Sequence, residues 1–225
     1  MSKILELFNQ IEASKVIASN IDYSEYIPLD LSITNVELEK HNLETAIDYE
    51  DFIQKYLDHN KAKIAYGGYI ETRNLYKRST VFKNDLIDER NIHIGLDLWI
   101  NEAAPIYSAL DGKIHSFQNN TALGDYGPTI IIKHEIDNIK FHTLYGHLSE
   151  ASLIGKSVGK LVKKGEQIAT LGLPPINGDY APHLHFQIII DMENKIGDYP
   201  GVCNIKNLEY YSINCPDPNL LLKIK

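Results

Sequence analysis

Histidine and aspartate residues gather in three short stretches of the chain. The stretch "APHLHFQIII" places His183 and His185 on either side of one leucine, at the start of an apolar run typical of a buried strand. Side chains alternate across a strand, so residues i and i+2 share a face and lie about 7 Å apart. We therefore expect both imidazoles on one face, at a spacing that suits one metal ligand and one catalytic group beside it.

Two further stretches carry residues of the same kind. In "HIGLD", His93 and Asp97 are four residues apart, and Gly95 between them permits the close backbone approach that a crowded site needs. In "LYGHLS", His147 ends an apolar strand directly after Gly146. Imidazole and carboxylate are both good zinc ligands. Three separate buried polar elements would each need their own hydrogen-bond partners, so we expect them to converge on one site.

The other five histidines are expected to lie outside that site. His41 and His59 fall in polar, helix-like surroundings and are predicted to be exposed. His115, His134 and His142 fall within strand patterns and are predicted to be half-buried polar residues without a chemical role.

Five stretches, taken in order, resemble a known family: "HIGLD", "APIYSALDGKI", "LYGHLS", "VGKLVKKGEQIATLG" and "PHLHF". Together they are similar to the zinc metallopeptidases of the LytM and lysostaphin family, which have a duplicated-hybrid-motif fold and cleave peptide bonds in bacterial cell-wall peptidoglycan. The resemblance covers residues 88–191. The resemblance implies that one zinc ion is held by His93, Asp97 and His185. It also implies that His147 and His183 are the two catalytic histidines.

The implied chemistry is hydrolysis of an amide bond. Three protein ligands leave one coordination position open, as in catalytic zinc sites. Zinc lowers the pKa of water to about 7 and polarises a carbonyl, and a neutral imidazole can take the proton of the attacking water. A second imidazole can stabilise the oxyanion or protonate the leaving amine. The sequence leaves open how His147 and His183 divide these roles, and manganese or iron would also suit the ligand types.

One loop departs from the family pattern, and one segment precedes the stretches that resemble the family. The loop "LGLPPINGDYA" replaces a short glycine- and serine-rich loop, and Pro128 stands where relatives usually have asparagine, so the substrate preference is left open. The segment "YGGYIETRNLYKRST" (66–80) runs toward "HIGLD". We expect it to cover a sheet edge, with a plug in the cleft as the alternative.

Composition excludes some classes of protein. The 225 residues, 44% of them hydrophobic, are enough for one sizeable core. With 30 acidic against 22 basic residues, the net charge of -8 argues against a nucleic-acid partner. The N-terminal stretch lacks a signal-peptide pattern and no run is long enough for membrane insertion, so a cytoplasmic location is expected, although a cell-wall substrate would require export or lysis. In that setting Cys203 and Cys215 are expected to be reduced thiols, and a disulfide between them is left open.

The pattern of elements predicts an α+β fold that is mainly β. An antiparallel sheet with a zinc cleft is expected to follow a helical N-terminal region. Residues 1–87 are expected to form that region and to pack on the core. Residues 88–191 are expected to form the metallopeptidase domain, and residues 192–225 a C-terminal closing segment. The stretch "DYEDFIQKYLDHNKAK" predicts an amphipathic helix with Asp48 as its N-cap. Turn-favouring residues 136–138 between two β-branched runs predict a hairpin.

The favoured function is that of a zinc-dependent peptidase acting on peptidoglycan peptides. One alternative is an intracellular zinc hydrolase of small muropeptides or other amides, and another is a non-catalytic binding module on the same fold. "SALDGKI" also resembles half of a biotinyl or lipoyl carrier motif, but the chain lacks a modifiable lysine in the expected setting and that hypothesis leaves the histidines unexplained. The expected partner is a peptide substrate, and the oligomeric state is open.

Overall fold

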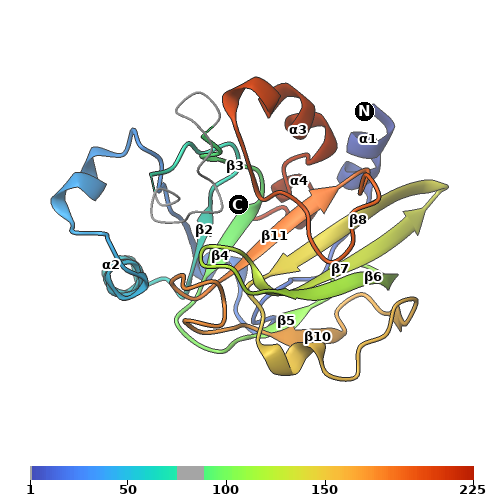
Figure 1. Ribbon diagram of the computed structural model, residues 1–225, viewed down its shortest axis with the longest axis horizontal. Coiled ribbons are helices and arrows are strands. Elements are labelled where there is room, and N and C mark those ends of the chain that lie inside the picture. Colours follow the sequence, from blue (N-terminus) through green and yellow to red (C-terminus); the bar gives the residue numbers. More distant parts are fainter. Residues whose placement is uncertain (1, 75–88) are drawn as a thin grey trace.

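The computed structural model describes residues 2–74 and 89–225, and its centre is an eight-stranded sheet (Figure 1). In spatial order the strands are β1 (Tyr26–Pro28), β2 (Ile64–Gly67), β4 (Leu96–Trp99), β11 (His183–Ile189), β8 (Ile139–Gly146), β7 (Gly127–Ile136), β6 (Gly112–Asn120) and β9 (Leu161–Val162). All neighbouring strands pair antiparallel except β1 and β2, which are parallel. The predicted fold class, mainly β with an antiparallel sheet, is confirmed.

Smaller elements surround this sheet. Two short pairs are formed by β5 (Pro105–Tyr107) with β10 (Gln167–Thr170) and by β3 (Ile92–His93) with β12 (Val202–Cys203). The helices are α1 (Ser2–Gln10), α2 (Ala46–Asn60), α3 (Leu208–Asn214) and α4 (Asn219–Leu222). Among the residues described, none of these helices has the length and apolar character that crossing a membrane requires.

Strand β11 is buried on both faces, and the two faces differ in kind. Leu184, Phe186 and Ile188 are fully buried in the main hydrophobic core. The alternate residues point to the opposite face, which carries His183, His185 and Gln187 at its start. One strand therefore supplies core packing on one side and polar side chains on the other, as the alternation of the sequence predicts.

The predicted hairpin is confirmed as β7 and β8, which pair in register from Ile130 opposite Tyr145 to Ile136 opposite Ile139. Asp137 and Asn138 in its turn have φ of 51° and 62°. Two successive residues with positive φ are typical of the tight turn that matches the twist of paired strands, and Asp and Asn tolerate that conformation best after glycine.

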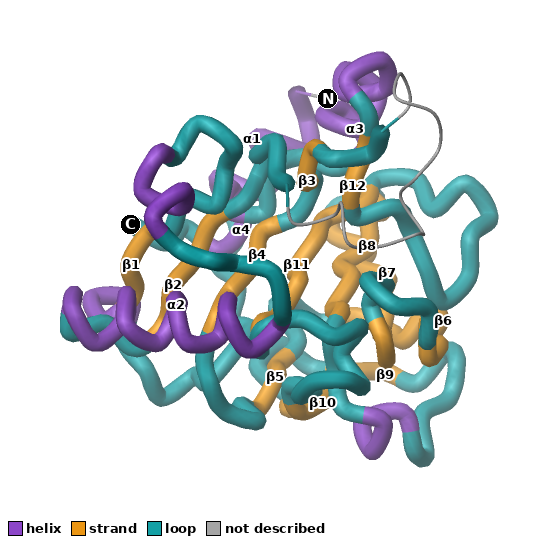
Figure 2. Tube along the Cα trace, turned by 60° about the vertical axis from the view of Figure 1, so that its left-hand side comes forward, coloured by secondary structure: helices purple, strands orange, loops and turns teal. Residues whose placement is uncertain are grey.

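Helix α2 confirms the predicted amphipathic helix but begins earlier than expected. Its N-cap is Thr45, whose side chain accepts from the backbone N–H of Asp48, while the Asp48 carboxylate accepts from the backbone N–H of Thr45. Asp48 is thus the third helical residue of a capping box and not the cap itself. Ile53 and Leu57 join a second hydrophobic cluster that includes Ala65 of β2 and Trp99 of β4. Helix α2 lies beside β2 (Figure 2).

The N-terminal region contains strands β1 and β2 as well as helices α1 and α2. Strands β1 and β2 belong to the main sheet, and β2 places Gly67 opposite Asp97. Residues 64–67 therefore cover the edge of β4, as expected for a segment that protects a sheet edge. Residues 75–80, on which the alternative of a plug depends, lie outside the described residues.

The C-terminal segment packs against the rest of the protein. Leu221, Leu222 and Ile224 are buried in the main core, where α4 contacts α1. Cys203 and Cys215 are both buried free thiols in a third cluster formed around the C-terminal segment. Burial of these apolar side chains ties both ends of the chain to the sheet.

His134 and His142 are buried rather than half-buried, and His134 is 0% exposed. The Nδ1–H of His134 donates to the carbonyl of Asp111, and its Nε2 accepts from the hydroxyl of Thr143, both at 2.8 Å. Burial lowers the pKa of His134 to about 4. The folded state thus holds a neutral imidazole that the unfolded state protonates at a pKa near 6.5.

This difference predicts acid sensitivity with a defined sign. The contribution of His134 is complete above pH 6.5 and is lost as the pH falls toward 4, because the unfolded chain binds the proton first. In His134→Asn, the fall in free energy of unfolding between pH 7 and pH 5 should be smaller than in wild type by about 2 kcal/mol. Urea unfolding at both pH values measures it, with the exposed His59→Asn as control. An equal fall in wild type and His134→Asn would contradict it.

Candidate metal centre and active site

The register of three neighbouring strands brings the predicted site residues together. His185 on β11 lies opposite Asp97 on β4 and opposite Gly146 on β8. His147 follows Gly146 directly, and His183 begins β11. Residues opposite each other in an antiparallel sheet have Cβ atoms about 5 Å apart, so the pairing alone places these side chains within reach of one another.

His93 reaches the same place from outside the main sheet. It ends β3, and the chain turns through Ile94 and Gly95 before entering β4. A Cβ atom on Gly95 would collide with the imidazole ring of His185. The close approach predicted for Gly95 is therefore present, and any larger residue would displace the ring.

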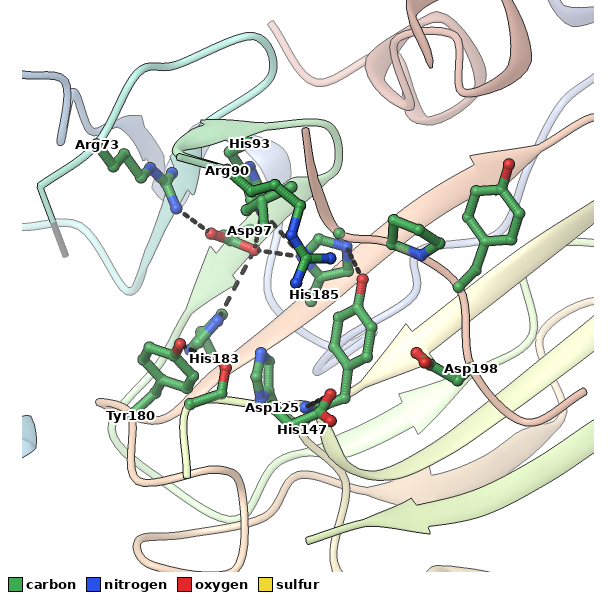
Figure 3. Close-up of a pocket in the computed structure, with 16 residues that line it drawn as sticks. Arg73, Arg90, His93, Asp97, Asp125, His147, Tyr180, His183, His185 and Asp198 are labelled. Atoms are coloured by element: carbon green, nitrogen blue, oxygen red, sulfur yellow. Dashed lines mark hydrogen bonds and ion pairs between the residues drawn. The ribbon is translucent and has the colours of Figure 1, made fainter. Parts of the chain in front are cut away.

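Three electron-pair donors meet at the centre of this cluster (Figure 3). His93 Nε2 lies 2.9 Å from His185 Nδ1 and 3.3 Å from Asp97 Oδ1, and His185 Nδ1 lies 3.2 Å from Asp97 Oδ1. The side chains of all three residues are 2–3% exposed. The residues predicted as metal ligands are thus brought together.

Hydrogen bonds on the far side of each ring determine which nitrogen faces the centre. His93 Nδ1 lies 2.9 Å from the carbonyl oxygen of Gly68, and His185 Nε2 lies 2.9 Å from Oε1 of Gln187. Both partners can only accept, because the amide nitrogen of Gln187 donates to the carbonyl of Pro200. In the neutral rings, His93 Nε2 and His185 Nδ1 therefore carry lone pairs.

This donor set fits a tetrahedral zinc ion. Two lone pairs and a carboxylate oxygen that face one another repel unless a cation lies between them. Ligands 2.0–2.1 Å from a tetrahedral zinc are separated by roughly 3.3 Å, close to the spacings seen here. The partners Gly68 and Gln187 supply the outer hydrogen bonds that orient metal-binding imidazoles.

The charge state of the cluster is set by burial and by one arginine. Burial lowers the pKa of His93 to about 4, so its ring is neutral at pH 7. Burial alone would raise the pKa of Asp97, but His93 and the guanidinium of Arg73 hold it well below its usual range. Arg73 donates from NH1 to Asp97 Oδ2 at 2.6 Å. The site therefore combines an ionised carboxylate with neutral imidazole, the protonation states that metal binding requires.

The two remaining histidines stand beside this centre and are held by one loop. Nδ1 of His147 donates to the carbonyl of Asn177, and Nδ1 of His183 donates to the carbonyl of Ala181, both at 2.7 Å. The two rings are 4.2 Å apart between centroids. Both acceptors lie in or directly after the loop "LGLPPINGDY", where the sequence departs from the family pattern. That departure leaves the histidines in place.

The tautomers and pKa values of these two histidines suit proton transfer. Because a carbonyl can only accept, Nδ1 carries the proton in each neutral ring and Nε2 keeps its lone pair. Burial lowers the pKa of His183, and burial with the neighbouring His183 lowers the pKa of His147 well below its usual range. Nε2 of His183 lies 3.8 Å from Asp97 Oδ1, at the edge of the metal centre. Both rings are therefore neutral proton acceptors at pH 7.

The five residues of the site line one pocket whose walls come from several segments. Tyr126 places its hydroxyl 3.3 Å from His185 Nε2 and forms one side. The C-terminal segment 199–202 forms another wall, and Arg90, Asp125 and Asp198 add charge to the lining (Figure 3). Burial raises the pKa values of both aspartates. The pocket is thus polar at its centre and carries both signs of charge in its lining.

Sequence reasoning missed three residues that contact the cluster: Arg73, Tyr126 and Gln187. Gln187 had a usable signal, because it is the next polar residue after His185 on the same face of an apolar strand. Tyr126 follows Asp125 in the turn that precedes β7, where tyrosine has no special meaning. Arg73 lies in an irregular, tyrosine-rich segment, and no spacing relates it to Asp97.

Comparisons with known proteins relate the segment that carries these residues to a peptidase family. Residues 91–196 match peptidase family M23. Over 99 residues the chain is 35% identical to the peptidoglycan DD-endopeptidase ShyB of Vibrio cholerae serotype O1, a match that covers 44% of this chain and 20% of that protein. The chain thus aligns with only a fifth of the length of this curated relative.

Solved structures show similar segments. A zinc-containing peptidase from Vibrio cholerae is 30% identical, with 48% of this chain and 30% of that chain covered and a TM-score of 0.34. The catalytic domain of lysostaphin from Staphylococcus simulans is 22% identical, with 75% and 99% covered and a TM-score of 0.40. The family match spans Asp97 and all four histidines of the site. Residues 91–196 are therefore similar to peptidase family M23, and the resemblance to the LytM- and lysostaphin-type peptidases predicted from the sequence is confirmed.

Proposed function

We propose that this chain is a zinc-dependent hydrolase that cleaves amide bonds in peptides derived from peptidoglycan. The observation that carries the proposal is the convergence of His93 Nε2, Asp97 Oδ1 and His185 Nδ1 within 3.3 Å, with their lone pairs turned inward. In this proposal these three residues are the metal ligands, and His147 and His183 are the catalytic histidines. The match of residues 91–196 to peptidase family M23 supports the reaction class.

A bound zinc ion would supply Lewis-acid chemistry, since it polarises a carbonyl and makes a hydroxide nucleophile available near neutral pH. The protein's own groups then handle the protons. The unprotonated Nε2 of His147 or His183 accepts a proton from the attacking water, and the resulting imidazolium can return it to the leaving amine. The carbonyls of Asn177 and Ala181 hold Nδ1 of these rings and become better partners when the rings are charged.

Burial of the site favours this use of imidazole. His147 and His183 are 5% and 6% exposed, so the charge that each gains on accepting a proton is little screened by water. The ionised Asp97 lies 3.8 Å from His183 Nε2 and stabilises an imidazolium there. This asymmetry favours His183 as the ring that carries the proton, and leaves Nε2 of His147 to accept a hydrogen bond from the attacking water and orient it.

The substrate's size is a second question, and charge bears on it. The net charge of -8 and the aspartates of the pocket disfavour approach to an anionic wall polymer. Soluble peptide fragments of the wall carry far less charge than the polymer. We therefore place hydrolysis of soluble muropeptides ahead of hydrolysis of intact sacculi, and the two are separated by offering both substrates to the purified protein.

The ligand assignment predicts the metal content of variants. Wild-type protein supplied with zinc should hold about one zinc per chain by elemental analysis. His185→Ala should lose it, with an affinity reduced by more than the roughly 10–100-fold that loss of an outer hydrogen-bond partner costs. His115→Ala is the matched control, because His115 lies on β6 outside the pocket. Equal zinc content in wild type and His185→Ala would contradict the assignment.

The catalytic assignment predicts loss of rate without loss of metal. His183→Ala and His147→Ala should each lower kcat by about 10²–10⁴-fold, the contribution typical of general acid–base catalysis. Chromatography with mass detection of cleaved muropeptides gives the rate, and elemental analysis on the same samples gives the zinc content. A variant that keeps full activity would remove that histidine from the mechanism. No cleavage by zinc-loaded wild type would instead favour a binding module.

A further inference from the structure

We propose that Arg73 is a positioning residue for the metal-binding carboxylate: it holds Oδ2 of Asp97 so that Oδ1 alone is presented to the metal. The inference rests on the metal centre of the proposed function and extends it to a segment outside the family match, which begins at residue 91. Arg73 would thus control metal affinity without touching metal or substrate.

The contact geometry supports this role. The NH1 group of Arg73 donates to Asp97 Oδ2 at 2.6 Å, while the other oxygen of the same carboxylate faces His93 and His185. The side chains of Arg73 and Asp97 are 1% and 2% exposed. A charge-assisted hydrogen bond in such surroundings is short and strong, so the carboxylate has one preferred orientation. Figure 3 shows Arg73 on the side of Asp97 away from His183.

Arg73 is itself held in place from three directions. Its Nε donates to Glu71 Oε2 at 2.8 Å, and its guanidinium lies 5.5 Å from the centre of the Trp99 ring. Gly68 has a φ of +106°, and a Cβ atom there would collide with the guanidinium. The planar fork of arginine can bond Glu71 and Asp97 at once, which a point charge on a lysine cannot.

Charge balance explains why an arginine belongs here. Glu71, Arg73 and Asp97 together carry one net negative charge, so the Arg73 cation offsets one of two nearby carboxylates. Burial raises the pKa of Glu71, whereas Arg73 lowers it. Without Arg73, the carboxylates of Glu71 and Asp97 would lie in poorly solvated surroundings with no cation between them, which is unfavourable in a buried site. Arg73 places its cation between the carboxylates of Glu71 and Asp97 and contacts both of them.

The segment that carries Arg73 also holds the first histidine ligand. The N–H of Arg73 donates to the carbonyl of Asn91, the N–H of His93 donates to the carbonyl of Glu71, and the N–H of Ile70 donates to the carbonyl of His93. The carbonyl of Gly68 also lies 2.9 Å from His93 Nδ1. Residues 68–73 therefore orient two of the three proposed ligands. They bond the backbone and the ring of His93, and they bond the carboxylate of Asp97.

The test is the zinc dissociation constant of Arg73→Lys, measured by competition with a chromophoric chelator at pH 7. Lysine keeps the positive charge, so its electrostatic repulsion of the metal differs little from that of arginine. The variant therefore measures the effect of losing the guanidinium group that bonds both Glu71 and Asp97. We expect zinc binding to weaken about 10–100-fold, as when an outer partner of a ligand is removed. Glu71→Gln is the matched variant, because it removes one anchor of Arg73 and leaves the bond to Asp97; a smaller loss is expected there.

A double-mutant comparison separates positioning from a general effect on packing. If Arg73 acts through Asp97, Arg73→Lys should weaken zinc binding in wild type and have little effect in Asp97→Asn. Equal losses in both backgrounds would overturn the proposal, as would unchanged zinc affinity in a folded Arg73→Lys protein. If Arg73→Lys does not fold, Glu71→Gln decides, and unchanged zinc affinity there counts against the proposal. Absence of zinc binding in wild type would instead refute the metal centre itself.

Discussion

The structure around the site depends on one constraint: an ionised carboxylate and two imidazole lone pairs are buried within about 3 Å of one another. Each of these groups would be unfavourable alone in a dry interior. Each is therefore tied on its outer side to a partner that fixes its orientation, namely Gly68 for His93, Arg73 for Asp97 and Gln187 for His185. The surrounding architecture can be understood as the means of bringing those partners to one place.

The partners come from segments far apart in the chain. Gly68 and Arg73 precede the family match, and Gln187 lies on the same strand as its ligand. Gln187 in turn donates to Pro200 and to the Cys215 sulfur, so the C-terminal segment is connected to His185 through one amide. The flanking regions thus contact the candidate metal centre and do more than cover the sheet.

The sequence predicted the elements in which polar and apolar residues alternate regularly. It did not predict contacts that leave no regular pattern in the sequence. The alternation in β11 correctly placed two imidazoles on one face and the hydrophobic residues on the other. The hairpin of β7 and β8 followed from β-branched runs and a two-residue turn. By contrast, β1 has three residues, too few for a pattern, and its parallel pairing with β2 was missed. The N-cap of α2 was misplaced by three residues because Thr45 and Asp48 are both good capping residues and act as a reciprocal pair.

The loop from Gly172 to Ala181 has a consequence for how this protein can change. It holds His147 and His183 through the main-chain carbonyls of Asn177 and Ala181, and not through side chains. A carbonyl is present whatever residue stands at the position, so substitutions that preserve the path of the backbone leave both histidines oriented. The exposed side chains of the loop, such as Leu173 and Ile176, are thereby free to vary in shape and charge. Recognition of new ligands can therefore evolve in this loop while the chemistry beside it is inherited intact.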